Sequence, residues 1–160
     1  MADPLRKRAV AATPSGKRAT YADLEAAPPE LVAEIIDGQL VTHRRPSPRH
    51  ALTSFALGGR LGAGFQFGEG GGPGGWVFMI EPELHLNGNV VVPDLAAWRR
   101  ERLPALPETA FVEIAPDWAC EILSASTEVS DRGRKRRIYA DAGVGHLWLV
   151  DPRHQLLEAF

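Results

Sequence analysis

Three charged residues stand in stretches that are otherwise apolar. Glu121 lies inside the run 117–123, which is typical of a buried strand, and Asp94 follows the apolar run 90–93. Lys135 begins the apolar face of a predicted helix. Because an ionised side chain is costly to bury without a partner or a metal, each of these residues calls for an explanation.

The three residue types together suit phosphodiester hydrolysis. Two carboxylates are the oxygen ligands that Mg²⁺ prefers, and they leave positions for waters and a phosphate oxygen. A lysine beside them can orient the attacking water or stabilise the charge that develops on the phosphate. The alternative is a buried ion pair of Lys135 and Glu121 that locks helix to strand, with Asp94 unrelated. Spacing alone leaves both interpretations open.

Periodicity places these side chains on definite faces. Period-two alternation puts Glu121 on the opposite face of its strand from Trp118 and Cys120. Spacings of three and four put Lys135 on the same helix face as Ile138 and Tyr139. The neighbouring arginines occupy mostly other faces, where they are candidates for solvent or phosphate contacts: Arg132, Arg134, Arg136 and Arg137.

The N-terminal half predicts an arm, a short helix, a hairpin and a longer helix. Residues 1–19 lack apolar periodicity and predict a loosely held arm, and Thr20 is a candidate helix N-cap. The runs 31–36 and 39–44 flank Asp37-Gly38 and predict a β-hairpin. Ser47-Pro48 is typical of a helix start and predicts a helix over 48–66.

The middle of the chain predicts a connection followed by strands. The glycine-rich stretch 68–75 lacks the lysine of a phosphate-binding loop, so a flexible connection is predicted. The runs 76–80, 83–86 and 89–94 predict consecutive strands in an antiparallel meander, with a tight turn at Asn87-Gly88. Asp94 would then emerge where the sheet ends.

The C-terminal part predicts a right-handed parallel crossover. Strand 117–123, helix 131–142 and strand 145–150 follow one another at the required length, and 155–160 begins another strand. We therefore expect one α/β (α+β) domain over 20–160, with a mixed central sheet flanked by helices. Because the sequence ends within this last strand, a domain shortened at its C-terminus is also expected.

Composition sets further limits. The chain has 160 residues, one cysteine and a formal net charge of −2 at pH 7. An internal disulfide and a cysteine-based zinc site are therefore excluded, and no histidine pair has the helical spacing of a zinc hydrolase. No apolar run is long enough to span a membrane, which favours a cytoplasmic location. The net charge does not by itself favour nucleic acid, although basic runs occur at 6–8, 44–45, 99–100 and 132–137.

Four segments resemble the Uma family of restriction-endonuclease-like proteins, in the PD-(D/E)xK nuclease superfamily. They are AEIIDGQLV, PSPRHALTS, NVVVPDLAAW and CEILSASTEVSDRGRKRRIYADAGVGHLWLVDP. The resemblance covers roughly residues 20–160 and implies Asp94 as the superfamily aspartate and Glu121 as the second acid. Where the usual motif has lysine two residues after that acid, this sequence has Leu123. The resemblance implies that the lysine of this family lies on the helix that follows the acidic strand, and Lys135 fits that position.

The resemblance also points to auxiliary residues. Glu34 corresponds to a family glutamate that joins the metal site, and the alternative is an ordinary hairpin surface position. His50 matches a recurrent family position near the metal or a phosphate, and the alternative is a structural hydrogen bond from a helix-surface histidine. Ser126, with its neighbours Ser124 and Thr127, either receives a phosphate or caps the next helix.

Two functions remain open from the sequence. The first is an endonuclease dependent on Mg²⁺ or Mn²⁺ that cleaves DNA, with Asp94 and Glu121 at the metal, Lys135 positioning water, Glu34 as auxiliary acid, and Arg134 as a possible phosphate contact. The second is a catalytically silent binding or assembly module on the same scaffold. The resemblance implies a homodimer under either, since related nucleases commonly act in pairs.

Overall fold

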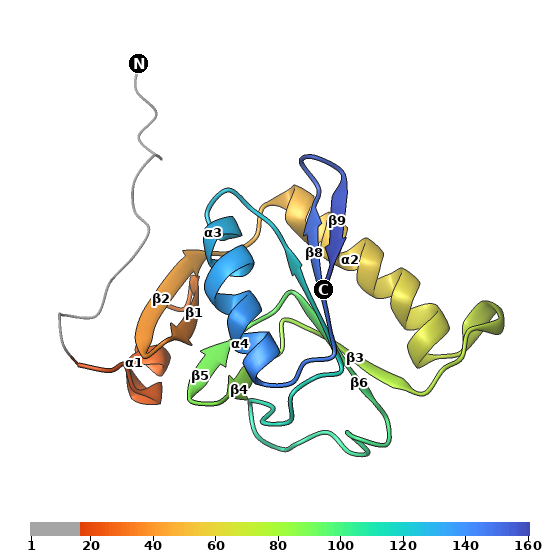
Figure 1. Cartoon of the computed structure of the whole chain (residues 1–160), viewed down its shortest axis with the longest axis horizontal. Coiled ribbons are helices and arrows are strands. Elements are labelled where there is room, and N and C mark those ends of the chain that lie inside the picture. Colours follow the sequence, from red (N-terminus) through yellow and green to blue (C-terminus); the bar gives the residue numbers. More distant parts are fainter. Residues whose placement is uncertain (1–16) are drawn as a thin grey trace.

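The protein contains two β-sheets that lie side by side (Figure 1) in a computed structural model that describes residues 17–160. The smaller sheet is antiparallel, with strand order β2-β1-β5-β4. The larger sheet has the order β3-β6-β7-β8-β9, in which β7 and β8 run parallel and the other neighbours antiparallel. The chain passes from the smaller sheet to the larger one at Asp94, so this residue lies where the two sheets meet.

The described residues form β-strands, α-helices and short π-helical and 3₁₀ turns. The strands are β1 (Leu31–Ile36), β2 (Gln39–Arg44), β3 (Trp76–Ile80), β4 (Leu84–Leu86), β5 (Asn89–Val91), β6 (Leu95–Arg99), β7 (Trp118–Ile122), β8 (His146–Asp151) and β9 (Leu156–Ala159). The α-helices are α1 (Tyr21–Glu25), α2 (Pro48–Leu61), α3 (Glu128–Ser130) and α4 (Arg136–Asp141). The π-helical turns η1 (Gly62–Gln66) and η3 (Asp131–Lys135) extend α2 and join α3 to α4, and η2 (Glu69–Gly71) is a 3₁₀ turn.

Both predicted two-residue turns are confirmed. Asp37 and Gly38 between β1 and β2 have φ of 53° and 76°, and Asn87 and Gly88 between β4 and β5 have φ of 51° and 79°. Two successive positive φ angles match the right-handed twist of the paired strands, which is why these residue types occur there. The hairpin β1–β2 therefore has the predicted boundaries.

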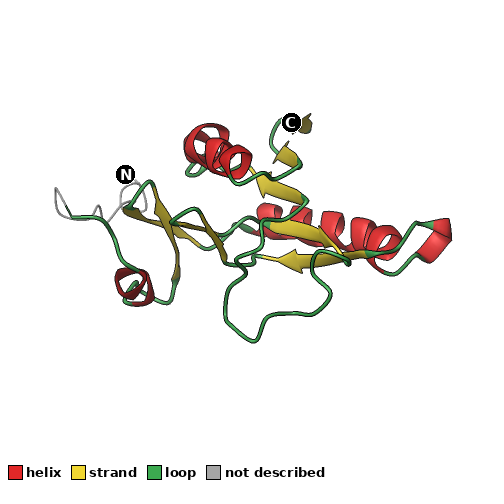
Figure 2. Cartoon of the chain, turned by 60° about the horizontal axis from the view of Figure 1, so that its bottom comes forward, coloured by secondary structure: helices red, strands yellow, loops and turns green. Residues whose placement is uncertain are grey.

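Helices cover the two faces of the larger sheet. Leu57 and Leu61 of α2 pack against one face, around Trp118 and Cys120. On the other face Ile138 and Tyr139 of α4 join a buried cluster that includes Trp98. Figure 2 shows the molecule as elongated, with the short helix α1 beside the hairpin at one end and the long helix α2 toward the other. The expected mixed sheet flanked by helices is confirmed.

The predicted antiparallel meander is wrong. β3 belongs to the larger sheet and pairs with β6, whereas β4 and β5 belong to the smaller one. The physical reason lies at Glu81-Pro82, where Glu81 has a φ of 49° and Pro82 has no N–H to donate to a strand neighbour. The chain therefore turns out of one sheet before it enters the next.

Asp94 does not end a strand as predicted. Strand β5 stops at Val91, and Pro93 separates it from β6, which begins at Leu95 and had no counterpart in the sequence analysis. β6 is fully buried from Leu95 to Trp98 and contains two alanines, so it shows neither alternation nor strong β propensity. Asp94 consequently lies directly before the first residue of a central strand of the larger sheet.

Three other expectations are modified. The helix predicted over 131–142 begins earlier, at Glu128, and contains the π-helical turn η3. The helix predicted over 48–66 is continuous but ends in the π-helical turn η1. Most of the predicted arm lies outside the described residues, and Ala19 at its end donates a backbone hydrogen bond to Gly38 at 2.8 Å. Over residues 17–160, no helix is long and apolar enough to cross a membrane.

Candidate active site

A cavity of about 190 Å³ opens where the two sheets meet. Three acidic residues line it, Asp94, Glu121 and Asp131, and Lys135 lines it beside them. Arg44, the last residue of β2, and Arg45, which follows it, line the cavity on one side, and hydroxyl residues line it elsewhere: Ser124, Ser126 and Thr127. Residues that are far apart along the chain therefore line one cavity.

Lys135 is buried and held between carboxylates. Its side chain is 3% exposed, and Nζ lies 2.9 Å from Glu34 Oε1 and 2.8 Å from Glu121 Oε1. Nζ also donates to the backbone carbonyl of Val92 at 3.3 Å, and Asp131 Oδ1 lies 3.8 Å away. An ammonium has three N–H donors, so these three near acceptors account for all of them.

Glu34 belongs to this cluster and is no surface residue of the hairpin. It is 2% exposed, its Oε1 accepts from Val92 N at 2.8 Å, and its Oε2 lies 3.5 Å from His43 Nε2. Strand β1 pairs with β5 at Ile35 and Val90, which brings Glu34 next to the end of β5. The side chain therefore links the smaller sheet to Lys135.

Glu121 lies at the centre of the larger sheet, on β7. Its Oε1 contacts Lys135 Nζ and accepts a hydrogen bond from the Tyr139 hydroxyl at 2.5 Å. Oε2 takes part in none of the polar contacts found among residues 17–160. One oxygen of this buried carboxylate is thus fixed by the helix, while the residue itself lines the cavity.

Asp94 is fixed through both of its oxygens. Oδ2 accepts from the backbone N–H of Ile122 at 2.6 Å, which places Asp94 beside the end of β7. Oδ1 lies 3.1 Å from Nε2 of His50 in the first turn of α2. The His50 side chain is 12% exposed, and its Nδ1 is buried without a hydrogen-bond partner among the described residues. His50 therefore faces the cavity and Asp94, not the helix surface.

Burial and charge shift the ionisation of the cluster. Burial alone would lower the pKa of Lys135, but the charges of Glu121 and Glu34 outweigh it and raise that pKa well above the usual range. Burial would raise the pKa of Glu34, but Lys135 and hydrogen bonds from His43 and Val92 lower it to about 2. Glu34 therefore stays ionised and Lys135 stays an ammonium.

Glu121 and Asp131 are harder to ionise than ordinary acids. Burial, together with the charges of neighbouring acids, raises the pKa of Glu121 well above the usual range although Lys135 opposes it. Burial likewise raises the pKa of Asp131. Three carboxyl groups lie around the Lys135 ammonium, those of Glu34, Glu121 and Asp131, and the charge of Asp94 also acts on Glu121. The cluster thus has more acidic groups than cations, and a further cation would favour their ionised forms.

The donor set fits a hard divalent cation. Asp94 directly precedes β6, Glu121 lies in the adjacent strand β7, and both line the same cavity. In the described part of the chain, no three His, Cys, Asp or Glu side chains are arranged to hold a metal by themselves. Mg²⁺ usually keeps several waters and binds through one or two carboxylates plus substrate phosphate, so two acids suffice for it.

Not every candidate residue reaches the cavity. Arg134 extends toward the hairpin, where Nη1 donates to Gln39 Oε1 at 3.3 Å. Ser126 lines the cavity, and its hydroxyl lies 3.0 Å from that of Ser124. Ser124 Oγ accepts from the backbone N–H of Thr127 at 3.3 Å in the turn before α3, and the N-cap residue of α3 is Thr127, whose side chain makes no capping hydrogen bond.

Three residues of the cluster were not singled out as site residues by the sequence: His43, Asp131 and Tyr139. Asp131 lies four residues before Lys135 and Tyr139 four after it, so helical spacing was an available signal for both. His43 faces Glu34 only because of the hairpin register, which pairs Glu34 with Val41. A single histidine on a strand gives no such signal.

Comparison with known proteins identifies the family and agrees with the fold. The family model Uma2, described as putative restriction endonuclease, matches residues 18–160. The chain belongs to the Uma2 family. The resemblance found in its sequence segments is confirmed, and this Uma2 protein is nuclease-like.

A solved structure has the same fold. It is the crystal structure of a putative nuclease belonging to DUF820 from Anabaena variabilis, with a TM-score of 0.70 and 20% sequence identity. The alignment covers 86% of this Uma2 chain and 80% of the Anabaena chain. None of the curated proteins compared with the chain matches it. The fold is therefore that of restriction-endonuclease-like proteins.

Proposed function

We propose that this protein is an endonuclease that hydrolyses phosphodiester bonds of DNA and depends on Mg²⁺ or Mn²⁺. The observation that carries the proposal is the pair of carboxylates, Asp94 and Glu121, that line one cavity beside the buried ammonium of Lys135. Membership of the Uma2 family supports the reaction class. Asp94 and Glu121 would hold the cation.

The contacts of each side chain suggest its role in the proposed reaction. When bound, Mg²⁺ supplies a Lewis acid that polarises a phosphate oxygen and makes a coordinated water more acidic. The Ile122 N–H and His50 fix the orientation of the Asp94 carboxylate. Tyr139 and Lys135 do the same for Oε1 of Glu121. Rigid ligands of this kind lose little freedom when a cation and substrate enter.

Lys135 is best suited to an electrostatic role. All three of its donors face Glu34, Glu121 and the Val92 carbonyl, so donating to water would require releasing one of them. Its positive charge lies at the cavity, where it would stabilise negative charge that develops on the attacked phosphate. Glu34 then acts as the positioning residue that keeps Lys135 in place and charged.

The reaction itself is a simple displacement. The oxygen of a water molecule forms a bond to phosphorus, and one P–O ester bond breaks. The water releases a proton to solvent, and the departing alkoxide takes up a proton. The products are one phosphate monoester end and one hydroxyl end.

Cleavage of plasmid DNA by the purified protein tests the proposal. With Mg²⁺ or Mn²⁺ the protein should nick supercoiled DNA, and chelation should stop it. Asp94→Asn should lower the rate at least about 100-fold, since it weakens a cation ligand at the reacting centre. Asp141→Asn is the matched control, because Asp141 is an exposed residue at the end of α4. Equal rates for the two variants would refute the assignment.

The catalytically silent module is the rival outcome. Calorimetric titration with Mn²⁺ distinguishes it, because a silent module should give no heat, no thermal shift and no cleavage. A cation site at Asp94 and Glu121 should give saturable binding that Asp94→Asn weakens and Asp141→Asn leaves unchanged. The homodimer implied by the resemblance stays a prediction, which sedimentation of the same samples tests.

A further inference from the structure

Two arginines stand at the rim of the cavity without a carboxylate partner. Arg44 and Arg45 are exposed, and both line the same hollow as Asp94 and Glu121. Arg45 Nη2 donates to the carbonyl of Pro29 at 3.1 Å, and neither guanidinium forms an ion pair with any residue of 17–160. Their charges are therefore available to a ligand.

Position at the cavity separates these two arginines from the others. Arg102 pairs with Asp117 at 2.8 Å, and Arg137 pairs with Asp37 at 2.8 Å. Arg153 contacts both Glu128 and Asp151. Other described arginines, such as Arg60, also lack a carboxylate partner, but Arg44 and Arg45 are the ones that line the cavity with Asp94 and Glu121.

The segment that carries the two arginines is anchored at both ends. Before it, Thr42 is buried in β2 and His43 contacts Glu34. After it, Ser47 caps α2, and His50 in the first turn contacts Asp94. Only Arg45 and Pro46 lie between β2 and Ser47. Both arginines are therefore held close to the cavity by residues that themselves contact the acidic cluster.

We propose that Arg44 and Arg45 bind the DNA backbone phosphates that flank the phosphodiester bond to be cleaved. This inference rests on the proposed nuclease function. A strand entering the cavity brings negative charge toward a cluster that already has an excess of acids, so a positive contact is needed beside it. A guanidinium can meet a phosphate with two parallel N–H donors, and Lys135 is already committed to carboxylates.

Binding of a short DNA duplex at several salt concentrations tests the inference. Ca²⁺ replaces Mg²⁺ so that the complex can be measured without turnover. Arg44→Ala and Arg45→Ala should each weaken binding about 10-fold and lower the slope of log K against log salt by about 0.9, because each removes one phosphate contact. Arg60→Ala is the matched control, since Arg60 lies exposed in the last turn of α2 and does not line the cavity.

Cleavage kinetics give an independent readout. In Mg²⁺ the rim variants should raise KM about 10-fold and change kcat much less, because they remove binding that is equal in the ground and transition states. If the parent protein binds and cleaves DNA but the rim variants keep the slope and KM of Arg60→Ala, the inference is overturned while the nuclease function stands. If the parent protein neither binds nor cleaves DNA, both are overturned.

Discussion

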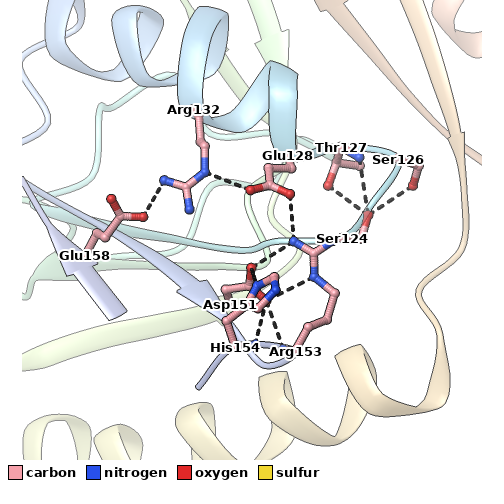
Figure 3. A network of polar contacts seen from close by, with 9 residues as sticks. All are labelled: Ser124, Ser126, Thr127, Glu128, Arg132, Asp151, Arg153, His154 and Glu158. Carbon is pink, nitrogen blue, oxygen red and sulfur yellow. Dashed lines mark hydrogen bonds and ion pairs between the residues drawn. The ribbon is translucent and has the colours of Figure 1, made fainter. Parts of the chain in front are cut away.

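Two ion-pair networks connect the α3–α4 helical segment to the strands, and they differ in burial and charge balance. The buried cluster consists of Glu34, Glu121, Asp131 and Lys135, with the partly exposed Asp94 beside it. The surface network, drawn in Figure 3, includes Glu128, Arg132, Arg153 and Glu158, together with Asp151, which is itself buried. Lys135 and Glu121 are 3% and 4% exposed at the side chain, whereas Arg132 and Glu158 are each 33% exposed.

The surface network alternates positive and negative groups. Arg153 Nη2 lies 2.7 Å from Glu128 Oε2 and 2.8 Å from Asp151 Oδ2. Arg132 contacts Glu128 at 3.0 Å and also pairs with Glu158 of β9. Each cation thus has two acidic partners and a side chain that is partly exposed to solvent. The network ties the β8–β9 turn to the start of α3, and its groups need no further partner.

The difference between the networks supports the proposal that the buried cluster is the active site. A partly exposed pair costs little to desolvate and contributes little, so it needs only a structural explanation. Three buried acids around one ammonium are unfavourable by themselves, and well-packed apolar residues would often be as stable. Their position beside a cavity supports the proposed cation site.

The largest expected effect is loss of the buried cation. Lys135→Met should lower the free energy of unfolding by about 3–5 kcal/mol, because Glu34 and Glu121 lose their shared partner while buried. Urea denaturation monitored by tryptophan fluorescence measures this. Lys17→Met, at an exposed position, should leave stability unchanged.

A second variant tests the cause of that loss. Lys135→Met combined with Glu34→Gln should be more stable than Lys135→Met alone, since Glu34 is the partner that stays ionised and its unpaired buried charge is removed with the cation. If Lys135→Met lowers the free energy of unfolding no more than a surface substitution does, burial of the cluster has no energetic consequence. The two networks would then not differ in their contribution to stability.

Glu34 provides the next largest effect, as a dependence on pH. Its pKa falls from an ordinary 4.5 to about 2 in the folded protein. Its contribution to the free energy of unfolding is therefore fully present above pH 4.5 and is lost as pH falls from 4.5 toward 2. The full contribution is roughly 3 kcal/mol. Glu34→Gln should flatten the acid limb of the stability curve, measured by urea denaturation between these pH values. Glu25→Gln, at an exposed site in α1, should leave the limb unchanged. An unchanged limb in Glu34→Gln would show that this carboxylate is no better stabilised than an ordinary one.

The sequence predicts those parts of the site that local periodicity determines. Lys135 faces the sheet as its helical spacing with Ile138 and Tyr139 indicates, and Glu121 lies in a buried strand as predicted. The turns at Asp37-Gly38 and Asn87-Gly88 were predictable because two-residue hairpins favour those residues. In each case the signal lies within a few residues of the feature.

Long-range pairing was not predictable in the same way. Strand β6 has alanines and no alternation, and its identity depends on burial between β3 and β7. The separation of β3 from β4 depends on which sheet each strand joins, and local propensity does not specify that. The place of His43 beside Glu34 also follows from pairing across the hairpin.

The smallest effect is expected in the surface network. Arg132→Ala should cost at most about 1 kcal/mol per lost pair, and the loss should shrink at high salt because the partly exposed charges of Arg132, Glu128 and Glu158 are screened. Nicking of plasmid DNA should persist at close to the parent rate, since Arg132 does not line the cavity. Denaturation at low and high salt, beside the same nicking assay, measures both. A loss of nicking as large as that of Asp94→Asn would show that the start of α3 must be held by this network for Lys135 to be placed correctly, and the two networks would then form one functional unit.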